Sequence, residues 1–212
     1  MGDCIPWCCT VLSGRYVRLE ALERKHVAGL VAAAEVDPAL YRWTVVPQGE
    51  DAVNAYVDRA LAEQQEERAL AFATVDVRSG EIVGSTRFFN IERWAWPKGH
   101  DRFGFATPDA CEIGYTWLTQ SAIRTAANTE SKLLLLAHAF ETWRVLRVCF
   151  HTDVRNERSR RAIERIGGEF EGILRAHRLA SDYATRDSAR YSILANAWPT
   201  IKNRLECRLG LA

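Results

Sequence analysis

Polar residues that could carry chemistry are concentrated in the second half of the sequence. Glu112 lies in an apolar run over residues 111–118, Asn156 and Ser159 begin a helical pattern, and His177 lies in a late strand-like run. Carboxylates and imidazoles are common general bases, because proteins can bring their pKa values close to the working pH. We therefore rank Glu112 as the first candidate base and His177 as the second, since a lone histidine is more often structural.

Each of these candidates also has a simpler interpretation. Glu112 could be a solvated strand carboxylate, because its neighbours Cys111 and Ile113 look like the core-facing residues. Asn156 and Ser159 could form a plain helix cap, since asparagine is a leading N-cap residue and serine is at home in a first turn. A cap of this kind needs no ligand, and it does not exclude one.

The segment that follows Glu112 predicts a strand, a loop and the start of a helix within residues 112–130. A helix start presents unpaired backbone N–H groups, and the helix dipole adds positive potential, so a pyrophosphate is a natural ligand. Arg124, Thr125 and Thr129 can supply side-chain donors there. The alternative is an ordinary helix start with Asn128 as its N-cap.

The surrounding pattern predicts one α/β domain over residues 14–212, preceded by a tail over residues 1–13. A central mixed sheet flanked by helices is expected, because strand and helix patterns are interleaved without a linker or repeat. Strands are predicted at 16–22, 70–77, 81–91, 111–118, 146–152, 170–179 and 188–194. Helices are predicted at 24–34, 51–67, 129–142, 157–166 and 198–209.

The composition of the chain argues against several classes of binding partner. The chain has 212 residues and a formal charge of +1, which gives no electrostatic reason to expect nucleic acid or an anionic membrane. Its apolar runs are too short to span a bilayer, and its N-terminus lacks a secretory signal, so we expect a cytoplasmic protein. The three tail cysteines have no histidine or second cysteine pair at zinc spacing nearby, so we expect reduced thiols and no metal. The cysteines are Cys4, Cys8, Cys9, Cys111, Cys149 and Cys207.

Three stretches together resemble the GNAT acyltransferases, over roughly residues 14–209. They are Glu112-Ile-Gly-Tyr-Thr-Trp-Leu118 with its helix start, Asn156-Glu-Arg-Ser-Arg-Arg-Ala-Ile-Glu-Arg-Ile-Gly167, and Phe170-Glu-Gly-Ile-Leu-Arg175 ahead of Tyr191-Ser-Ile193. The spacing of the asparagine, serine and glycine in the second stretch is similar to that of the RimJ/RimL-like branch. The resemblance implies a mostly antiparallel twisted sheet and acetyl-CoA or another acyl-CoA as co-substrate.

The resemblance also implies roles for individual residues. Asn156 would meet the pantetheine arm and Ser159 would approach the thioester sulfur, with Ile163 in the place where many relatives have a tyrosine. The family's glycine-rich pyrophosphate loop matches Ile123, Ala126 and Asn128, so its glycines are absent. The residues expected to bind acyl-CoA are Trp117, Leu118, Arg124, Thr125, Ala126, Ala127, Asn128, Thr129, Asn156 and Ser159.

The implied reaction is direct attack of a primary amine, on a small molecule or a protein N-terminus, upon the thioester. We discount an acyl-cysteine intermediate, because neither buried cysteine has a context that lowers a thiol pKa. Loop aromatics could line the acceptor pocket, or they could be packing lids or a dimer surface: Trp43, Trp94, Trp96, Phe103 and Phe105. A catalytically inactive acyl-CoA-binding module and a protein without a CoA site remain alternatives, and the chain could be a monomer or a homodimer.

Overall fold

The structure is a computed structural model that describes residues 10–35 and 41–211. It contains one eight-stranded sheet with the order β1-β2-β3-β4-β5-β6-β8-β7. Neighbouring strands are antiparallel except β5 and β6, which run parallel. The strands are β1 (Val11–Ser13), β2 (Val17–Ala21), β3 (Ala69–Asp76), β4 (Ile82–Glu92), β5 (Ala110–Leu118), β6 (Arg147–Asp153), β7 (Glu169–Leu179) and β8 (Thr185–Leu194). The predicted mixed, mostly antiparallel sheet is confirmed.

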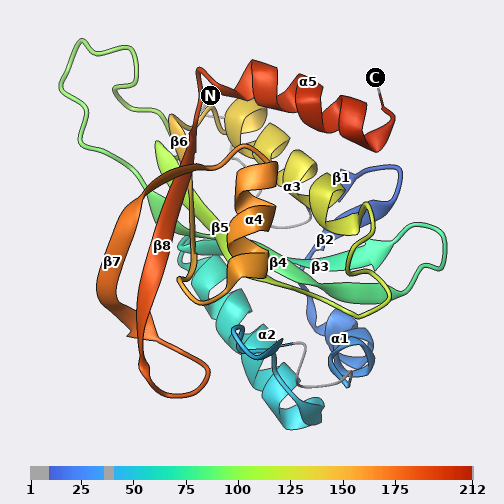
Figure 1. The fold of residues 1–212 in the computed structure, drawn as a ribbon. Helices are drawn as coiled ribbons and strands as arrows, with labels where there is room; N and C mark the ends of the chain where they lie inside the picture. The colour runs from blue at the N-terminus through green and yellow to red at the C-terminus, as the bar shows by residue number, and fades with distance from the viewer. Residues whose placement is uncertain (1–9, 36–40, 212) are drawn as a thin grey trace.

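Helices cover both faces of this sheet (Figure 1). They are α1 (Val27–Ala34), α2 (Gly49–Gln65), α3 (Ala127–Ala137), α4 (Glu157–Arg165) and α5 (Trp198–Leu209). The larger core cluster joins α3, α4 and α5 to one face through Leu136, Ile163 and Leu205. A second cluster joins α1 and α2 to the other face through Leu30 and Val57. The first face is called the α3 face below, and the second the α2 face.

Local sequence explains why most elements form where they do. β3 is buried along nearly its whole length, as expected for a strand covered on both faces. α4 begins at an asparagine cap, and α5 begins with a proline and ends at Gly210, whose φ of 66° suits a residue without a Cβ. These signals are local, so the sequence predicts these elements well.

Three boundaries differ from the prediction. Residues 11–13, assigned to the tail, form β1 and pair with β2, while Cys4, Cys8 and Cys9 lie outside the described residues. α3 begins at Ala127 with Ala126 as its N-cap, so the alternative interpretation with Asn128 as the cap is wrong. The predicted helix over 129–142 ends in a π-helical turn at His138–Thr142.

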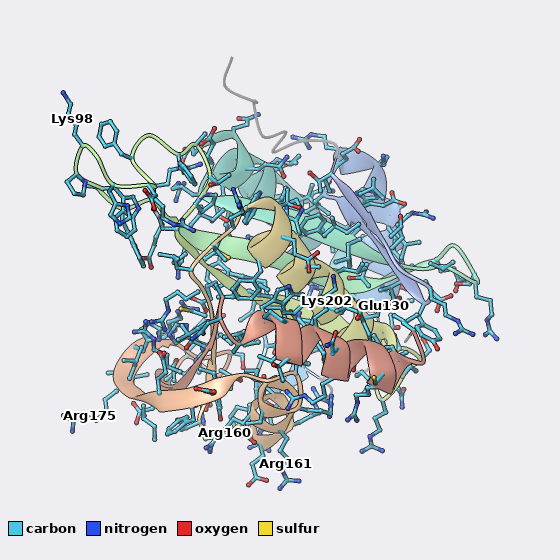
Figure 2. All side chains as sticks on the ribbon, turned by 90° about the horizontal axis from the view of Figure 1, so that it is seen from above. Lys98, Glu130, Arg160, Arg161, Arg175 and Lys202 are labelled. Atoms are coloured by element: carbon cyan, nitrogen blue, oxygen red, sulfur yellow. The ribbon has the colours of Figure 1, made fainter. Side chains whose placement is uncertain are left out.

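A buried carboxylate fixes the start of α3 against the β1–β2 turn (Figure 2). Glu130 accepts backbone N–H groups from Arg15 at 2.8 Å, Tyr16 at 2.6 Å and Val17 at 2.7 Å. A Cβ on Gly14 would lie 2.4 Å from the Glu130 carboxyl carbon, so only glycine allows this approach. The position of the α3 N-terminus relative to the sheet is therefore tightly determined.

Candidate functional site

The central feature of the site is an opening between the two parallel strands. β5 and β6 pair only at Ala110–Arg147, Cys111–Val148 and Glu112–Cys149. Beyond this point, β5 continues along β4 as far as Leu118, and β6 continues along β8 as far as Asp153. The two strands therefore separate, and residues 113–118 of β5 have a free edge toward β6. Such an edge presents backbone N–H and C=O groups that an extended ligand can bind.

A bulge shapes the free edge of β5. Tyr115 has a φ of 50°, and the β4–β5 register shifts between Ser85 and Arg87. The extra residue turns Tyr115 toward the α2 face, where the guanidinium of Arg87 lies 4.2 Å from its ring centre. Arg87 is itself buried and paired with Glu63 at 3.0 Å. A bulge with a left-handed non-glycine residue is a costly conformation, and this one is held by buried neighbours.

Glu112 lies at the point of separation and faces the α2 side of the sheet. Its side chain is almost completely buried, so the interpretation as a solvated carboxylate is wrong, whereas Cys111 and Ile113 do face the core. Arg178 donates to Glu112 Oε2 at 3.0 Å and Asn90 donates to the same oxygen at 2.8 Å. Both oxygens of the carboxylate therefore face charged or polar groups.

The charge of Glu112 is stabilised by this environment. Burial acts to raise the pKa of Glu112, but the contacts with His151 and Arg178 outweigh burial and bring the pKa below its ordinary value. The group is therefore ionised near neutral pH. A carboxylate with a lowered pKa is a weak base by itself, and the groups next to it determine which atom can receive a proton.

His151 is the neighbour that sequence analysis missed. Its Nδ1 atom lies 2.9 Å from Glu112 Oε1, although the ring is turned so that neither nitrogen has an aligned hydrogen bond. His177 lies beside it, with a distance of 5.0 Å between the two ring centres. Glu112 and His177, the two candidate bases from the sequence, therefore both lie next to His151. No local pattern distinguishes His151 from any other polar residue on a strand.

An irregularity in β7 brings both His177 and Arg178 to this site. Residues 175–177 stand opposite the single residue Asp187, and Ala176 has a φ of 47°. Consecutive strand residues normally point to opposite faces, and a bulge removes that alternation. Burial, together with the charges of Arg178 and His151, lowers the pKa of His177. His177 is therefore mostly neutral at pH 7.

The loop and first turn of α3 lie at the far end of the free β5 edge. Thr125 Oγ1 accepts from Ala127 N at 3.1 Å, and the N–H groups of Asn128 and Thr129 belong to the first turn, which has no preceding helical carbonyl. Ala126 has a φ of −66°, so it needs no glycine there. The left-handed residue of the loop is Arg124, with a φ of 64°. The absence of the two family glycines therefore strains the backbone at neither Ala126 nor Asn128.

The first turn of α4 is on the same face of the sheet as α3. Asn156 is buried, and its Oδ1 accepts from Ser159 N at 3.0 Å, so the predicted cap is confirmed. Ile163 is buried in the core cluster. Trp117 and Leu118 are buried at the end of β5, where the Tyr41 hydroxyl donates to Leu118 O at 3.2 Å. The residues predicted to bind acyl-CoA thus lie at the helix starts of α3 and α4 and at the end of β5.

A buried lysine beneath β4 and β5 is the second group that sequence analysis missed. Lys132 on α3 donates to Thr116 Oγ1 at 2.6 Å and to Thr86 Oγ1 at 3.1 Å. Burial lowers the pKa of Lys132 to about 7. The sequence pattern of a helix predicts that a lysine such as Lys132 faces solvent. Its burial follows only from the packing of α3 on the sheet.

A cavity of about 480 Å³ opens on the other side of the site. One wall comes from the segment before α2 and the other from the β7–β8 turn, immediately after Arg178. Its lining residues carry no charge: Tyr41, Thr44, Val45, Val46, Gln48, Leu179, Ala180, Ser181 and Tyr183. The five loop aromatics proposed from the sequence are not among them.

Those aromatics have other surroundings. Trp43 lies between the guanidinium groups of Arg42 and Arg155. Trp94 N and Trp96 Nε1 both donate to Asp109 at 2.8 Å, which fixes the loop before β5. This loop projects beyond the sheet, with Lys98 pointing outward, and Phe103 and Phe105 are exposed on it (Figures 1 and 2).

Other kinds of site find no support in residues 10–35 and 41–211. No three histidine, cysteine or acidic side chains are grouped there so as to hold a metal ion. Cys111, Cys149 and Cys207 are free, and burial raises the pKa of Cys111, which disfavours its thiolate. In the same ranges, no helix is long and apolar enough to cross a lipid bilayer.

Comparisons with known proteins agree with this geometry. A family model described as "Acetyltransferase (GNAT) domain" matches residues 17–169. A "GCN5-related N-acetyltransferase from Brucella melitensis" is 29% identical, with a TM-score of 0.79, covering 94% of this chain and 85% of that chain. A putative acetyltransferase from T. thermophilus is 35% identical, with a TM-score of 0.74, covering 94% of this chain and 96% of that chain.

The RimJ/RimL-like resemblance also has a counterpart among solved structures. Mycobacterium smegmatis RimJ, solved in complex with CoA-disulfide, has a TM-score of 0.76 and 22% identity, covering 93% of this chain and 91% of that chain. At this identity the likeness shows the shared fold. Comparison with curated protein sequences found no significant match.

Proposed function

Because the chain belongs to the GNAT acetyltransferase family, we propose that it transfers an acetyl or other short acyl group from acyl-CoA to a primary amine. The amine attacks the thioester directly. Its source is a small molecule or a protein N-terminus. No metal takes part in this proposal.

The separation of β5 and β6 is the observation that carries the proposal. The two parallel strands part after three residue pairs, and we infer that acyl-CoA and amine use a passage between the two faces of the sheet there. On the α3 face, two helix starts flank this passage, where they can bind the phosphates and the extended arm of acyl-CoA. On the α2 face, we assign the end of this passage to Glu112 and His151, and the amine to the uncharged cavity that begins at Leu179, next to Arg178. An acyl donor and an amine can thus approach each other from opposite faces.

On the donor side, we assign the pyrophosphate to the loop and first turn at residues 124–129. The exposed Arg124 and the free N–H groups of the α3 N-terminus support this assignment. The pantetheine arm then runs along the free β5 edge, past Trp117 and Leu118, toward Asn156 and Ser159. Cap and ligand roles are compatible for Asn156, because its amide nitrogen remains available when Oδ1 holds the cap.

On the acceptor side, we assign Glu112 and His151 to removal of the amine proton. Glu112 stays ionised beside Arg178, so it can orient the His151 ring. The uncharged walls of the 480 Å³ cavity suit an apolar group next to the reacting amine.

The test is release of free thiol from acetyl-CoA by the purified chain, with a panel of primary amines and peptides with free N-termini. We expect thiol release that depends on one class of amine. Binding is measured separately by thermal unfolding with CoA, since a ligand at 100 times its Kd stabilises by about 2.7 kcal/mol. CoA binding without turnover across the panel would favour an inactive acyl-CoA-binding module, and absence of binding would reject both.

A further inference from the structure

Lys132 is the most unusual buried group in the described part of the chain. It lies in the second turn of α3 with 6% of its surface exposed. Its amine has two neutral partners, the hydroxyls of Thr86 on β4 and Thr116 on β5. Those hydroxyls are also 2.9 Å from each other, so the three groups form one small network.

A buried amine whose partners are neutral hydroxyls makes a poor structural element. Burying an ammonium is unfavourable unless a carboxylate compensates it, and an apolar side chain of similar length would pack there without that penalty. Burial lowers its pKa to about 7, and neither of its two hydroxyl partners carries a charge that would offset the desolvation. A group in this state gains or loses a proton easily near neutral pH, which is the property required of a proton donor.

The place of Lys132 connects it to the proposed reaction. Thr116 lies on the stretch of β5 that has no β6 partner, between Glu112 and the end of the strand. Lys132 reaches it from α3, and therefore from the face on which acyl-CoA is assigned. An arm that runs from the α3 N-terminus along this edge passes beside Thr116. Ile163 occupies the position where many relatives have a tyrosine, and it is buried in the core.

We propose that Lys132 supplies, through the Thr116 hydroxyl, the proton that the departing CoA thiolate requires; this rests on the proposed acyl transfer. The amine nitrogen bonds to the carbonyl carbon, and the C–S bond breaks with its electron pair passing to sulfur. The sulfur takes the hydroxyl proton of Thr116, which is replaced from Lys132 Nζ. The proton of the amine leaves on the opposite face toward His151 and Glu112, and solvent recharges Lys132 before the next cycle.

The chain offers a matched pair of variants for the test. Thr116→Val and Thr86→Val each remove one hydroxyl that contacts Lys132, but only Thr116 lies on the free strand edge. Lys132→Met removes the amine and keeps its length, and Thr116→Ser keeps the hydroxyl. Turnover with acetyl-CoA, Kd for CoA, Tm and the pH dependence of kcat are measured for each variant and the wild type.

We expect Lys132→Met and Thr116→Val to lose about 100-fold in kcat, as for removal of a general acid, with little change in the Kd for CoA. Thr86→Val should stay close to the wild type, and Thr116→Ser, which keeps the hydroxyl, should recover most of the kcat that Thr116→Val loses. Wild-type kcat should fall as the pH rises above about 7, because the donor loses its proton, and Lys132→Met should lack that limb.

Two outcomes overturn the inference while leaving the proposed function intact. One is full turnover by Lys132→Met, and the other is equal loss in Thr86→Val and Thr116→Val, which would mark the network as structural. If the wild type turns over no amine, the proposed function fails first, and the inference fails with it.

Discussion

Two groups of buried polar side chains lie on opposite faces of the sheet, one on each side of the opening between β5 and β6. On the α2 face, Glu112 is surrounded by Arg178, Asn90 and His151. On the α3 face, the partners of Lys132 within residues 10–35 and 41–211 are the two threonine hydroxyls. The carboxylate is compensated by opposite charge, whereas the amine is not.

This difference separates a group that keeps its charge from one that changes it. Opposite charge near Glu112 lowers its pKa despite burial, while burial alone lowers the pKa of Lys132 to about 7. Acyl transfer needs a proton to leave the amine on one side and to reach the sulfur on the other. The difference between Glu112 and Lys132 matches these two proton transfers, and it leads to separate predictions for the two residues.

The largest expected effect is on stability, in Lys132→Met. The pKa of Lys132 is about 7 in the folded chain and about 10.4 when unfolded, so below pH 7 both states are charged and the folded state bears the full burial cost. Between these values the unfolded state binds more protons, and wild-type stability should rise with pH. Near neutral pH the variant should gain on the order of 4 kcal/mol, from about 1.4 kcal/mol per pKa unit.

Urea unfolding of both proteins between about pH 6 and about pH 10 checks this, and the gap should close toward the alkaline end. Lys202→Met is the matched control, because Lys202 is paired with Glu141 at 2.8 Å. A wild-type stability that stays flat over this range, or a destabilised Lys132→Met, would contradict an uncompensated charge at Lys132.

The next effect is on turnover, in Glu112→Gln. This variant keeps the shape of the side chain, removes the negative charge and leaves His151 without its carboxylate. We expect a loss of about 100-fold or more in kcat near neutral pH, the usual contribution of a general base. His177→Gln, assayed alongside, should lose less, because His151 and not His177 lies directly against the Glu112 carboxylate. If His177→Gln loses the activity and Glu112→Gln keeps it, the base is assigned to the wrong residue.

A smaller effect is expected for Asn156→Ala at the start of α4. Loss of the bond from Ser159 N to Asn156 Oδ1 should lower stability by about 1 kcal/mol, as for other N-caps. If Asn156 also meets the pantetheine arm, the Kd for acetyl-CoA should rise in the same variant. Calorimetric titration with CoA separates the two roles, since an unchanged Kd would leave Asn156 as a cap alone.

The smallest effect is expected for Ser159→Ala, which tests whether Ser159 or Lys132 supplies the proton on the α3 face. The cap uses the backbone N–H of Ser159, so removal of its hydroxyl should leave Tm nearly unchanged. Turnover should fall if this hydroxyl assists the thiolate, but by less than in Lys132→Met, because an alcohol lacks the acidity to supply the proton itself. A larger loss in Ser159→Ala than in Lys132→Met would move the proton source to α4.

Much of the fold follows from the sequence, because the signals that set it are local. Alternating and continuous apolar runs mark the strands from β2 to β8, and the caps at Asn156 and Gly210 bound α4 and α5. β1 was missed because three residues are too short to show a period, and its pairing with β2 defines it. The family resemblance rests on the same local stretches, and the match over residues 17–169 confirms it.

The sequence by itself determined the order of elements, the likeness to an acyltransferase and the presence of Glu112, Asn156 and Ser159. Only the tertiary structure decided what these residues touch. Arg178 reaches Glu112 across 66 positions, and Lys132 reaches Thr86 across 46. Both contacts depend on the strand order, on the opening between β5 and β6, and on bulges at residues 115 and 175–177. A helical or strand period in the sequence shows which face of an element is apolar. It carries no information about which distant polar groups meet on a buried face. Those contacts set the pKa values of the buried groups, and the pKa values decide the chemistry.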